Sequence, residues 1–515
     1  MALLRSVATV GGYTLLSRIF GFVRDMLIAA YAGAGPVADA FFVAFKLPNF
    51  FRALFAEGAF NAAFVPLFTE TNTRGGRAAA LAFAERALSI LLVALFLFMT
   101  LCQIFMPWLM IGLAPGFNDE PAKFDLAVTF TRITFPYLLF ISLVSLLGGV
   151  LNSIGRFAAV AATPVVLNIT IIVVLLATVQ FMPSAGHALS WGVMAAGVTQ
   201  FLWLVWACHR AGFLLRLPRP ALTPEVRRLL KLIMPAALGA GVVQINLVIG
   251  TMLASLLPSG AISYLFYADR LNQFPIGVVG VAVGTALLPL LSRHIASGDA
   301  RAAHDSQNRA IEITLLLGLP STVAFLVVPT ELIGALFERG AFGPAATAAT
   351  AAALMAYSIG LPAYVLVRAL SPGFYARKDT RTPVRFAIIS IVVNIGVSLI
   401  LLRSLEHAGL ALATALSSWT NALLLAGTLH RRGYWVPDRR LKSRLWRILL
   451  SSLLMAAALF GFARLLAPWF AGDSLHRLGA LGLVVAAGIA VYGLAAQVTG
   501  AARLGEMKAM LRRRG

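Results

Sequence analysis

The chain has 515 residues, of which 60% are hydrophobic and only 12% are charged, and its mean hydropathy is +0.87. A soluble domain carries about 25% charged residues, and it lacks repeated apolar runs of about 18 or more residues, so these values exclude an ordinary soluble protein. The formal net charge of +22 would suggest nucleic-acid binding in a soluble chain, but in a membrane protein it is typical of basic cytoplasmic loops. We therefore predict an all-α polytopic membrane protein.

Apolar segments follow one another along the whole chain. A helix needs about 20 mostly apolar residues to cross ~30 Å of hydrocarbon. The first segment contains Arg18, Arg24 and Asp25, so we do not interpret it as a cleaved signal peptide. By the length criterion the sequence contains about 14 membrane-spanning helices, near residues 7–32, 36–68, 82–112, 126–151, 158–181, 185–208, 229–256, 261–292, 306–336, 344–372, 382–402, 408–430, 445–468 and 478–500.

Basic residues cluster in every second loop between these segments. The basic loops fall near residues 74–77, 156, 210–231, 293–309, 377–385 and 431–447, and the tail adds Lys508 and Arg512–Arg514. The alternate loops are short and neutral or acidic, at 33–36, 118–120, 183–187, 258–260, 331–343 and 471–474. Because basic loops remain in the cytoplasm, we expect both termini there and the alternate loops outside.

Short patterns recur along the chain. Asp39 and Lys46 are seven residues apart, and Ser263 and Arg270 repeat this spacing 224 residues later. Thr163-Pro-Val likewise recurs 219 residues later. Repeats of this kind build transporters whose site lies between two lobes. We predict an N-lobe at 1–208, a basic cytoplasmic linker at 209–231, a C-lobe at 232–430, and two extra spans with a basic tail at 431–515.

Charged residues lie inside the first, second and eighth spans. An arginine at the centre of a bilayer costs roughly 2.5–3.5 kcal/mol, so several facing lipid would cost roughly 10 kcal/mol. They must therefore pair with one another or line a wet cavity. The cations are Arg18, Arg24, Lys46, Arg52 and Arg270, and the acids are Asp25, Asp39, Glu57 and Asp269.

Pairing would join Arg24 to Asp25, Lys46 to Asp39, and Arg270 to Asp269. Five cations against four acids leave one cation over, and neighbours on a helix diverge by about 100°, so we expect Arg24 and Asp25 to pair poorly. We predict that at least three arginines face a central aqueous cavity. Such a cavity suits a phosphate-bearing ligand, because guanidinium groups match phosphate oxygens in bidentate geometry.

No sequence motif indicates catalysis. The chain lacks a phosphate-binding P-loop, a zinc-protease helix motif and a convincing pair of nucleophile and base, so we expect neither an enzyme nor an ATP-driven pump. The histidines lie at or near loops, and Cys102 and Cys208 lie in apolar runs without metal-ligand spacing.

Several blocks of sequence are specific enough to suggest a family. They are RIFGFVRD at 18–25, ADAFFVAFKLPN at 38–49, EGAFNAAFVP at 57–66, YADRL at 267–271, GTALLP at 284–289, and PGFYAR at 372–377 followed by Thr382-Pro383. The chain resembles the MurJ (MviN) lipid II flippase family of the multidrug/oligosaccharidyl-lipid/polysaccharide exporter superfamily. The resemblance covers nearly the whole chain and is weakest at 431–515.

The resemblance implies a flippase in the inner membrane of a bacterium. Such a protein moves lipid II, the undecaprenyl-pyrophosphate-linked precursor of peptidoglycan, from the cytoplasmic to the periplasmic leaflet by alternating access. It further implies that Arg18, Arg24, Arg52 and Arg270 meet the pyrophosphate, that Asp25 and Ser263 face the cavity, and that Asp39, Lys46, Glu57 and Asp269 act at a portal or gate.

Some relatives carry a sodium site, for which Asn246 and Asp379 are candidate ligands here. The membrane potential is a second candidate energy source. The partners implied are lipid II, membrane lipids and proteins of cell-wall synthesis or division, with no nucleic acid.

Four other functions make different demands on the sequence. A flippase for another polyprenyl-pyrophosphate-linked oligosaccharide would need the same arginines, whereas an exporter of cationic drugs should have acid-rich spans. A scaffold that recruits proteins through its basic loops would not depend on the intramembrane arginines. A membrane enzyme acting on polyprenyl phosphates would need an acid/base pair that the sequence does not contain.

Overall fold

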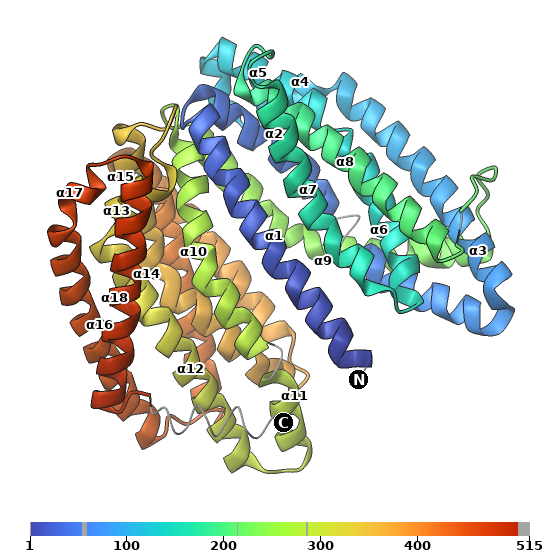
Figure 1. The fold of residues 1–515 in the computed structure, drawn as a ribbon. Coiled ribbons are helices and arrows are strands. Elements are labelled where there is room, and N and C mark those ends of the chain that lie inside the picture. Colours follow the sequence, from blue (N-terminus) through green and yellow to red (C-terminus); the bar gives the residue numbers. More distant parts are fainter. Residues whose placement is uncertain (1, 54–58, 214, 285–286, 503–515) are drawn as a thin grey trace. The chain divides into compact units, whose positions relative to one another are not determined.

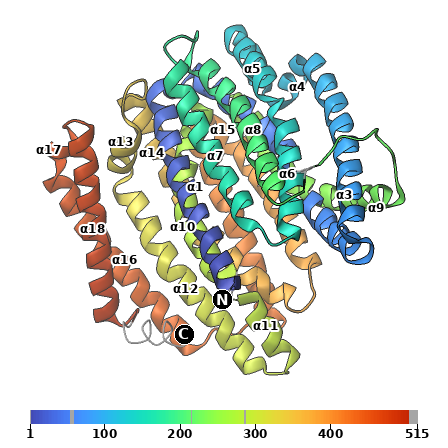
Figure 2. The ribbon, with the colours of Figure 1, turned by 45° about the vertical axis from the view of Figure 1, so that its right-hand side comes forward.

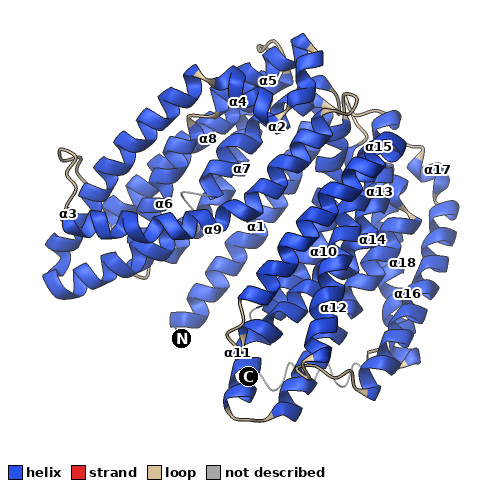
Figure 3. Ribbon diagram, turned by 180° about the vertical axis from the view of Figure 1, so that it is seen from behind, coloured by secondary structure: helices blue, strands red, loops and turns tan. Residues whose placement is uncertain are grey.

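The computed structural model describes residues 2–53, 59–213, 215–284 and 287–502. The described residues form helices joined by turns and loops, with no strand among them (Figures 1 and 3). By its internal contacts the chain divides into two compact units, Met1–Ser263 and Tyr264–Gly515. The prediction of an all-α polytopic membrane protein is confirmed.

The first unit contains α1 (Ala2–Ala32), α2 (Pro36–Arg52), α3 (Ala59–Ile104), α4 (Met106–Leu113), the 3-10 helix η2 (Pro115–Asp119), α5 (Pro121–Thr134), α6 (Tyr137–Ser153), α7 (Phe157–Thr178), α8 (Ala185–Arg210) and α9 (Pro224–Ser255). Helix α10 (Ala261–Gly284) begins at the end of this unit. The second unit continues with α11 (Leu287–Ala296), α12 (Ala300–Val327), α13 (Pro329–Phe337), α14 (Pro344–Tyr375), α15 (Arg381–Arg431), α16 (Arg439–Leu465), α17 (Ala467–Phe470) and α18 (Ser474–Thr499).

Within the residues that the structure describes, the predicted apolar segments are mainly helical, but several boundaries differ. Within α3 and α15 two segments run together, and the change of direction occurs at single residues with positive φ, Gly76 at 71° and Glu406 at 46°. In the described residues, nine helical stretches are long and apolar enough to cross a membrane. The helices outside that set include α1, α2 and α10, which carry most of the charged residues predicted to be functional.

The first unit is organised by helix pairs. Helix α7 packs against α1 and α8, α2 packs against α5, and α3 packs against α6 and α9. An aromatic row joins the two parts of α3 on either side of Gly76: the ring centroids of Phe60 and Phe64 are 5.2 Å apart, and those of Phe64 and Phe83 are 5.5 Å apart. Because α9 packs on α3, it falls in the first unit, although the repeat places it in the predicted C-lobe.

The second unit packs α14 against α12 and α15, and α16 against α12 and α18. Its core includes Leu315, Val365, Leu370, Phe374 and Leu429. Helices α16, α17 and α18 lie together at one edge of this unit (Figure 2). Helices α16 and α18 correspond to the two extra spans predicted after residue 431, and the short α17 connects them. The predicted lobe boundaries rest on the repeat, and they stay a prediction.

Candidate functional site

Arg24 and Asp25 form a buried ion pair on α1. The Arg24 Nε and Nη2 atoms donate to Asp25 Oδ1 at 3.0 and 2.7 Å, and Arg24 is only 8% exposed. The expectation that helix geometry would keep these neighbours from pairing well is wrong. The arginine side chain is long enough to fold back around the helix and reach the next carboxylate.

Helix α7 supplies a third member of this cluster. Asn168 accepts a hydrogen bond from Arg24 Nη1 at 2.8 Å and donates to the Ser17 carbonyl at 3.0 Å. A methyl group at Gly21 would lie 3.3 Å from the Asn168 amide nitrogen, so this glycine allows the two helices to approach. Arg18 lies on the same helix, but its side chain is exposed. Two arginines predicted to be equivalent therefore have different surroundings.

Asp39 lies near the start of α2 and is 1% exposed. It accepts hydrogen bonds from the Gly260 amide at 2.7 Å, the Ser263 amide at 2.9 Å and the Ser263 hydroxyl at 2.6 Å. These donors belong to the turn before α10 and to its first helical turn. Asp39 therefore caps α10 from another helix, where the unsatisfied amides and the helix dipole favour a carboxylate.

Gly260 makes this cap accessible to Asp39. Its φ is 103°, a conformation that favours glycine because a Cβ would clash with the backbone. The turn can therefore present the Gly260 amide toward α2. The predicted residues Asp39 and Ser263, 224 positions apart in sequence, are brought into direct contact.

Lys123 completes the Asp39 cluster, although it was not among the residues predicted to be functional. This lysine is 3% exposed, and its ammonium group lies 3.4 Å from Asp39 Oδ2 and 2.8 Å from the Ser259 hydroxyl. It also lies 3.5 Å from Glu120 Oε1 and 4.3 Å from the centroid of the Phe117 ring. The acidic loop at 118–120 is expected on the periplasmic side, where basic residues are uncommon. A lysine so close to this loop was therefore the feature of the sequence that could have identified Lys123.

The 3-10 helix η2 fits closely against the end of α9. A Cβ built on Gly116 would lie 2.1 Å from the Ser255 carbonyl oxygen, so only glycine fits there. The Gly116 amide donates to the Ser255 hydroxyl at 3.2 Å. Further along α2, Lys46 donates to the Thr251 hydroxyl of α9 at 3.0 Å. Helix α2, η2 and α5 are thus fastened to α9 and the following turn at several points.

The remaining predicted residue of α2, Arg52, is the last residue of the helix. Arg52 Nε donates to Asn49 Oδ1 at 3.1 Å, and the Asn49 amide in turn donates to the Phe45 carbonyl at 2.8 Å. Glu57 lies outside the described residues. Its predicted role at the portal stays a prediction.

Two predicted residues belong to the second unit, on α10. The Arg270 guanidinium lies 4.5 Å from the centroid of the Phe266 ring. Asp269 accepts a hydrogen bond from Gln273, one turn further along the helix. The shared cavity predicted for Arg270 and the arginines of the first unit stays a prediction.

The two candidate sodium ligands lie on different units. Asn246 lies on α9, where it is half-buried. The Asp379 carboxylate accepts hydrogen bonds from the Thr382 hydroxyl at 2.6 Å and the Thr382 amide at 3.0 Å, and it pairs with Arg432 at 2.8 Å. These hydrogen bonds from Thr382, with those from Arg432, lower the pKa of Asp379 from 3.8 to about 2. In the structure this carboxylate caps α15, and the sodium assignment stays a prediction.

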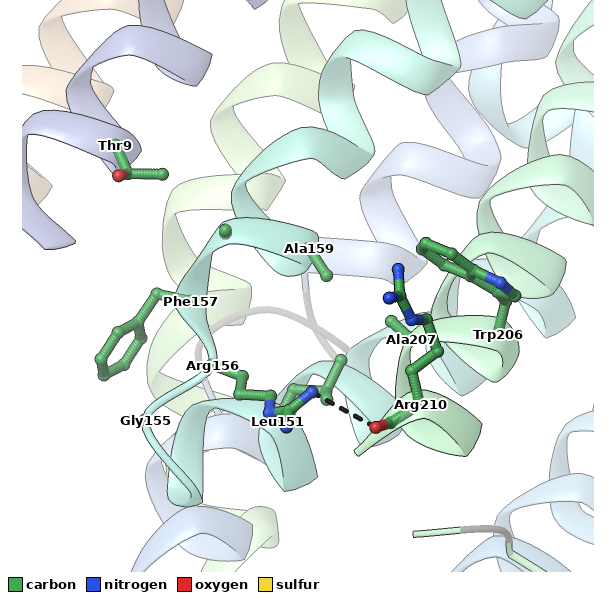
Figure 4. Close-up of a pocket in the computed structure, with 10 residues that line it drawn as sticks. Thr9, Leu151, Gly155, Arg156, Phe157, Ala159, Trp206, Ala207 and Arg210 are labelled. Atoms are coloured by element: carbon green, nitrogen blue, oxygen red, sulfur yellow. Dashed lines mark hydrogen bonds between the residues drawn. The ribbon is translucent and has the colours of Figure 1, made fainter. Parts of the chain in front are cut away.

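A basic pocket lies elsewhere in the first unit, where α6 and α8 end and α7 begins. It has a volume of about 520 Å³ and is lined by Thr9, Leu151, Gly155–Ala159, Trp206, Ala207 and Arg210. Arg156 reaches toward the Arg210 carbonyl, whereas Phe157 points away from both arginines (Figure 4). The Arg210 guanidinium lies 5.0 Å from the centroid of the Trp206 ring. No residue predicted to be functional lines this pocket.

These arrangements define two kinds of chemistry. The arginines on α1, α2 and α10 supply fixed positive charge in apolar helices, which can balance a phosphate group. The Asp39 cluster supplies a set of hydrogen bonds that fasten a turn, and such bonds can be exchanged for water.

Comparison with known proteins agrees with this description. The sequence model of the family described as "Lipid II flippase MurJ" matches residues 28–479. A probable lipid II flippase MurJ of Rhizobium meliloti (strain 1021) is 46% identical over 520 residues, covering 100% of this chain and 97% of that protein. The lipid II flippase MurJ of Burkholderia cenocepacia is 38% identical over 442 residues, covering 85% of this chain and 86% of that protein.

Solved structures give the same result for the fold. A lipid II flippase MurJ in an inward closed conformation matches with a TM-score of 0.77 and 27% identity, covering 95% of this chain and 98% of that one. An inward-facing multidrug transporter of the MATE family, from the MOP superfamily, matches with a TM-score of 0.63 at 14% identity, which shows the shared fold alone. The family is one of transporters rather than enzymes. The chain is a multi-pass membrane protein that belongs to the MurJ lipid II flippase family.

Proposed function

We propose that this protein moves lipid II from the cytoplasmic to the periplasmic leaflet of a bacterial inner membrane. The observation that carries the proposal is the match to lipid II flippases over the whole chain, at 46% identity to one of them. The charged residues of α1, α2 and α10 support it physically. A pyrophosphate in hydrocarbon is prohibitively costly unless cations compensate it.

Arg18, Arg24, Arg52 and Arg270 are the proposed pyrophosphate ligands. Arg18 is exposed and can meet a ligand directly. Arg24 is held by Asp25 and Asn168, so a phosphate oxygen would have to share or replace those hydrogen bonds. Guanidinium groups can do both, because they carry five donors in a fixed plane.

The Asp39 cluster is the proposed outer gate. The alternation of loop charge supports a position on the periplasmic side for the turns at 118–120 and 258–260. The bonds from Asp39 to Gly260 and Ser263 would hold this end closed while the head group enters from the cytoplasmic side. Parting of the same bonds would release the head group into the periplasm, with the polyprenyl tail remaining in lipid.

The energy source is proposed to be the membrane potential, with sodium as the second candidate. Moving one uncompensated charge across the membrane is worth about 2.3 kcal/mol per 100 mV, so the potential can reset an empty basic cavity. Flipping measured in sealed vesicles should then depend on an imposed potential. A rate that ignores both the potential and a sodium gradient would refute the coupling.

Topology and partners complete the proposal. Both termini would lie in the cytoplasm, as the basic loops indicate. Proteins of cell-wall synthesis or division would be functional neighbours, since they supply and consume lipid II.

Complementation tests the function. The chain is expressed in cells depleted of their own lipid II flippase, beside Arg18→Ala, Arg24→Ala, Arg52→Ala and Arg270→Ala variants of confirmed expression. We expect growth with the unmodified chain and loss of growth with the arginine variants. Rescue by every variant would show that these arginines are not ligands. A well-expressed chain that fails to rescue would refute lipid II as the substrate and favour another polyprenyl-pyrophosphate oligosaccharide.

A further inference from the structure

The charged groups that close the proposed outer gate all lie on one of its two sides. The side formed by α2, η2 and α5 carries the charged groups of the cluster, Asp39, Lys123 and Glu120. The side formed by the turn before α10 contributes neutral donors, which are the Gly260 amide and the groups of Ser259 and Ser263. Each hydrogen bond between this cluster and residues 259–263 therefore joins a charged group to a neutral one.

Lys123 is placed to remain with Asp39 when these sides part. Both residues lie on the same side of the gate, since α2 packs against α5. The contacts of Lys123 with Asp39, Glu120 and Phe117 do not involve the turn before α10, and only its bond to Ser259 does. Helix α5 can thus carry the counter-charge through the movement.

We propose that Lys123 is the positioning residue that stays paired with Asp39 while the outer gate opens. Opening then replaces the hydrogen bonds to the neutral groups of residues 259–263 by hydrogen bonds to water, and it separates no pair of opposite charges. The inference rests on the proposed function, because it assumes that this end opens during transport. Its physical reason is that separating a buried ion pair is far more costly than replacing hydrogen bonds to neutral groups by bonds to water.

The consequence can be tested by removing the counter-charge. With Lys123→Met the closed gate would hold the Asp39 carboxylate, 1% exposed, without a counter-ion, whereas the open gate would let water reach it. The variant should therefore favour the open gate. Methionine matches lysine in length, so the space beside Phe117 stays filled.

A cysteine at Val43 reports on opening. Val43 is fully buried and lies one turn beyond Asp39 on the same face of α2. The reporter is placed in a chain whose buried native cysteines, Cys102 and Cys208, are replaced by alanine. Intact cells are treated with a membrane-impermeant maleimide, and the labelling rate is measured for variants that reach the membrane at normal levels.

We expect Lys123→Met to raise the labelling rate about tenfold, which corresponds to ~1.4 kcal/mol. Lys123→Arg keeps the charge and should change the rate less than about twofold. In an Asp39→Asn background Lys123→Met should have no further effect, because no carboxylate then needs a counter-ion. As a control, Arg477→Met removes the 2.9 Å pair with Glu338 in the second unit and should leave labelling unchanged.

Two results would overturn the inference. Unchanged or slower labelling with Lys123→Met in a well-expressed chain would show that the lysine does not hold the gate closed through Asp39. An equal increase in the Asp39→Asn background would show a packing role. Labelling does not require transport, so a failure of complementation by the unmodified chain would refute the proposed function separately.

Discussion

Removing Asp25 should destabilise the first unit, whereas removing Arg18 should not. Arg24 and Asp25 form a pair whose side chains are 9% and 3% exposed. Removing one partner of a buried pair costs about 3–5 kcal/mol, because the other charge is left without compensation. In Asp25→Ala the guanidinium keeps its 2.8 Å hydrogen bond to Asn168, so we expect the lower end, about 3 kcal/mol.

The assay is thermal unfolding of the purified protein in detergent, followed by the fluorescence of its tryptophans. At about 2 °C per kcal/mol for a unit of this size, Asp25→Ala should lower Tm by about 6 °C. Arg18→Ala is the matched control on the same helix, and its exposed side chain predicts a change within about 1 °C. A Tm for Asp25→Ala equal to that of the control would contradict the assignment of the ion pair.

Three further variants test other contacts. Gly116→Ala should destabilise the contact between η2 and α9 by about 2–3 kcal/mol. Gly112→Ala is the control, because a Cβ there would meet open space, and it should leave the stability unchanged. Thermal unfolding compares the two variants. The pKa of Asp379 is about 2 in the folded chain, against 3.8 ordinarily. Because the folded value is lower, the ionised Asp379 carboxylate stabilises the folded chain fully above about pH 4, and this contribution is lost as the pH falls toward 2. Asp379→Asn should flatten that dependence. Glu312→Gln should cost about 3 kcal/mol by removing the ion pair that Arg444 makes between α16 and α12, and limited proteolysis before α16 should accelerate.

The membrane-spanning segments could be predicted because run length and loop charge follow directly from the physics of the bilayer. The breaks at Gly76 and Glu406 fall in the gaps predicted between segments, at 69–81 and 403–407, but the backbone conformation at these residues could not be predicted. Nothing in the sequence around Glu406 distinguishes a residue with positive φ from a helical one. The ion pair between Arg24 and Asp25 was also not expected. An ideal helix gives the direction of each Cβ, but it does not show how far an arginine side chain can reach.

The Asp39 cluster shows the limits of sequence reasoning at the site. Asp39 and Ser263 were identified through a repeat and a family resemblance, and the structure places them 2.6 Å apart. Lys123 was missed because it falls between the loop predicted at 118–120 and the apolar segment predicted at 126–151. Only the packing of α5 on α2 reveals that its ammonium group is buried.

Flipping in reconstituted vesicles tests the central claim most directly. Lipid II is placed in sealed vesicles that contain the purified chain, and its transfer between leaflets is followed by accessibility of the head group to an added enzyme. We predict transfer with the unmodified chain and a loss of at least about tenfold with Arg270→Ala at unchanged Tm. Transfer at the same rate with Arg18, Arg24, Arg52 and Arg270 all replaced by alanine would contradict translocation through a cationic cavity.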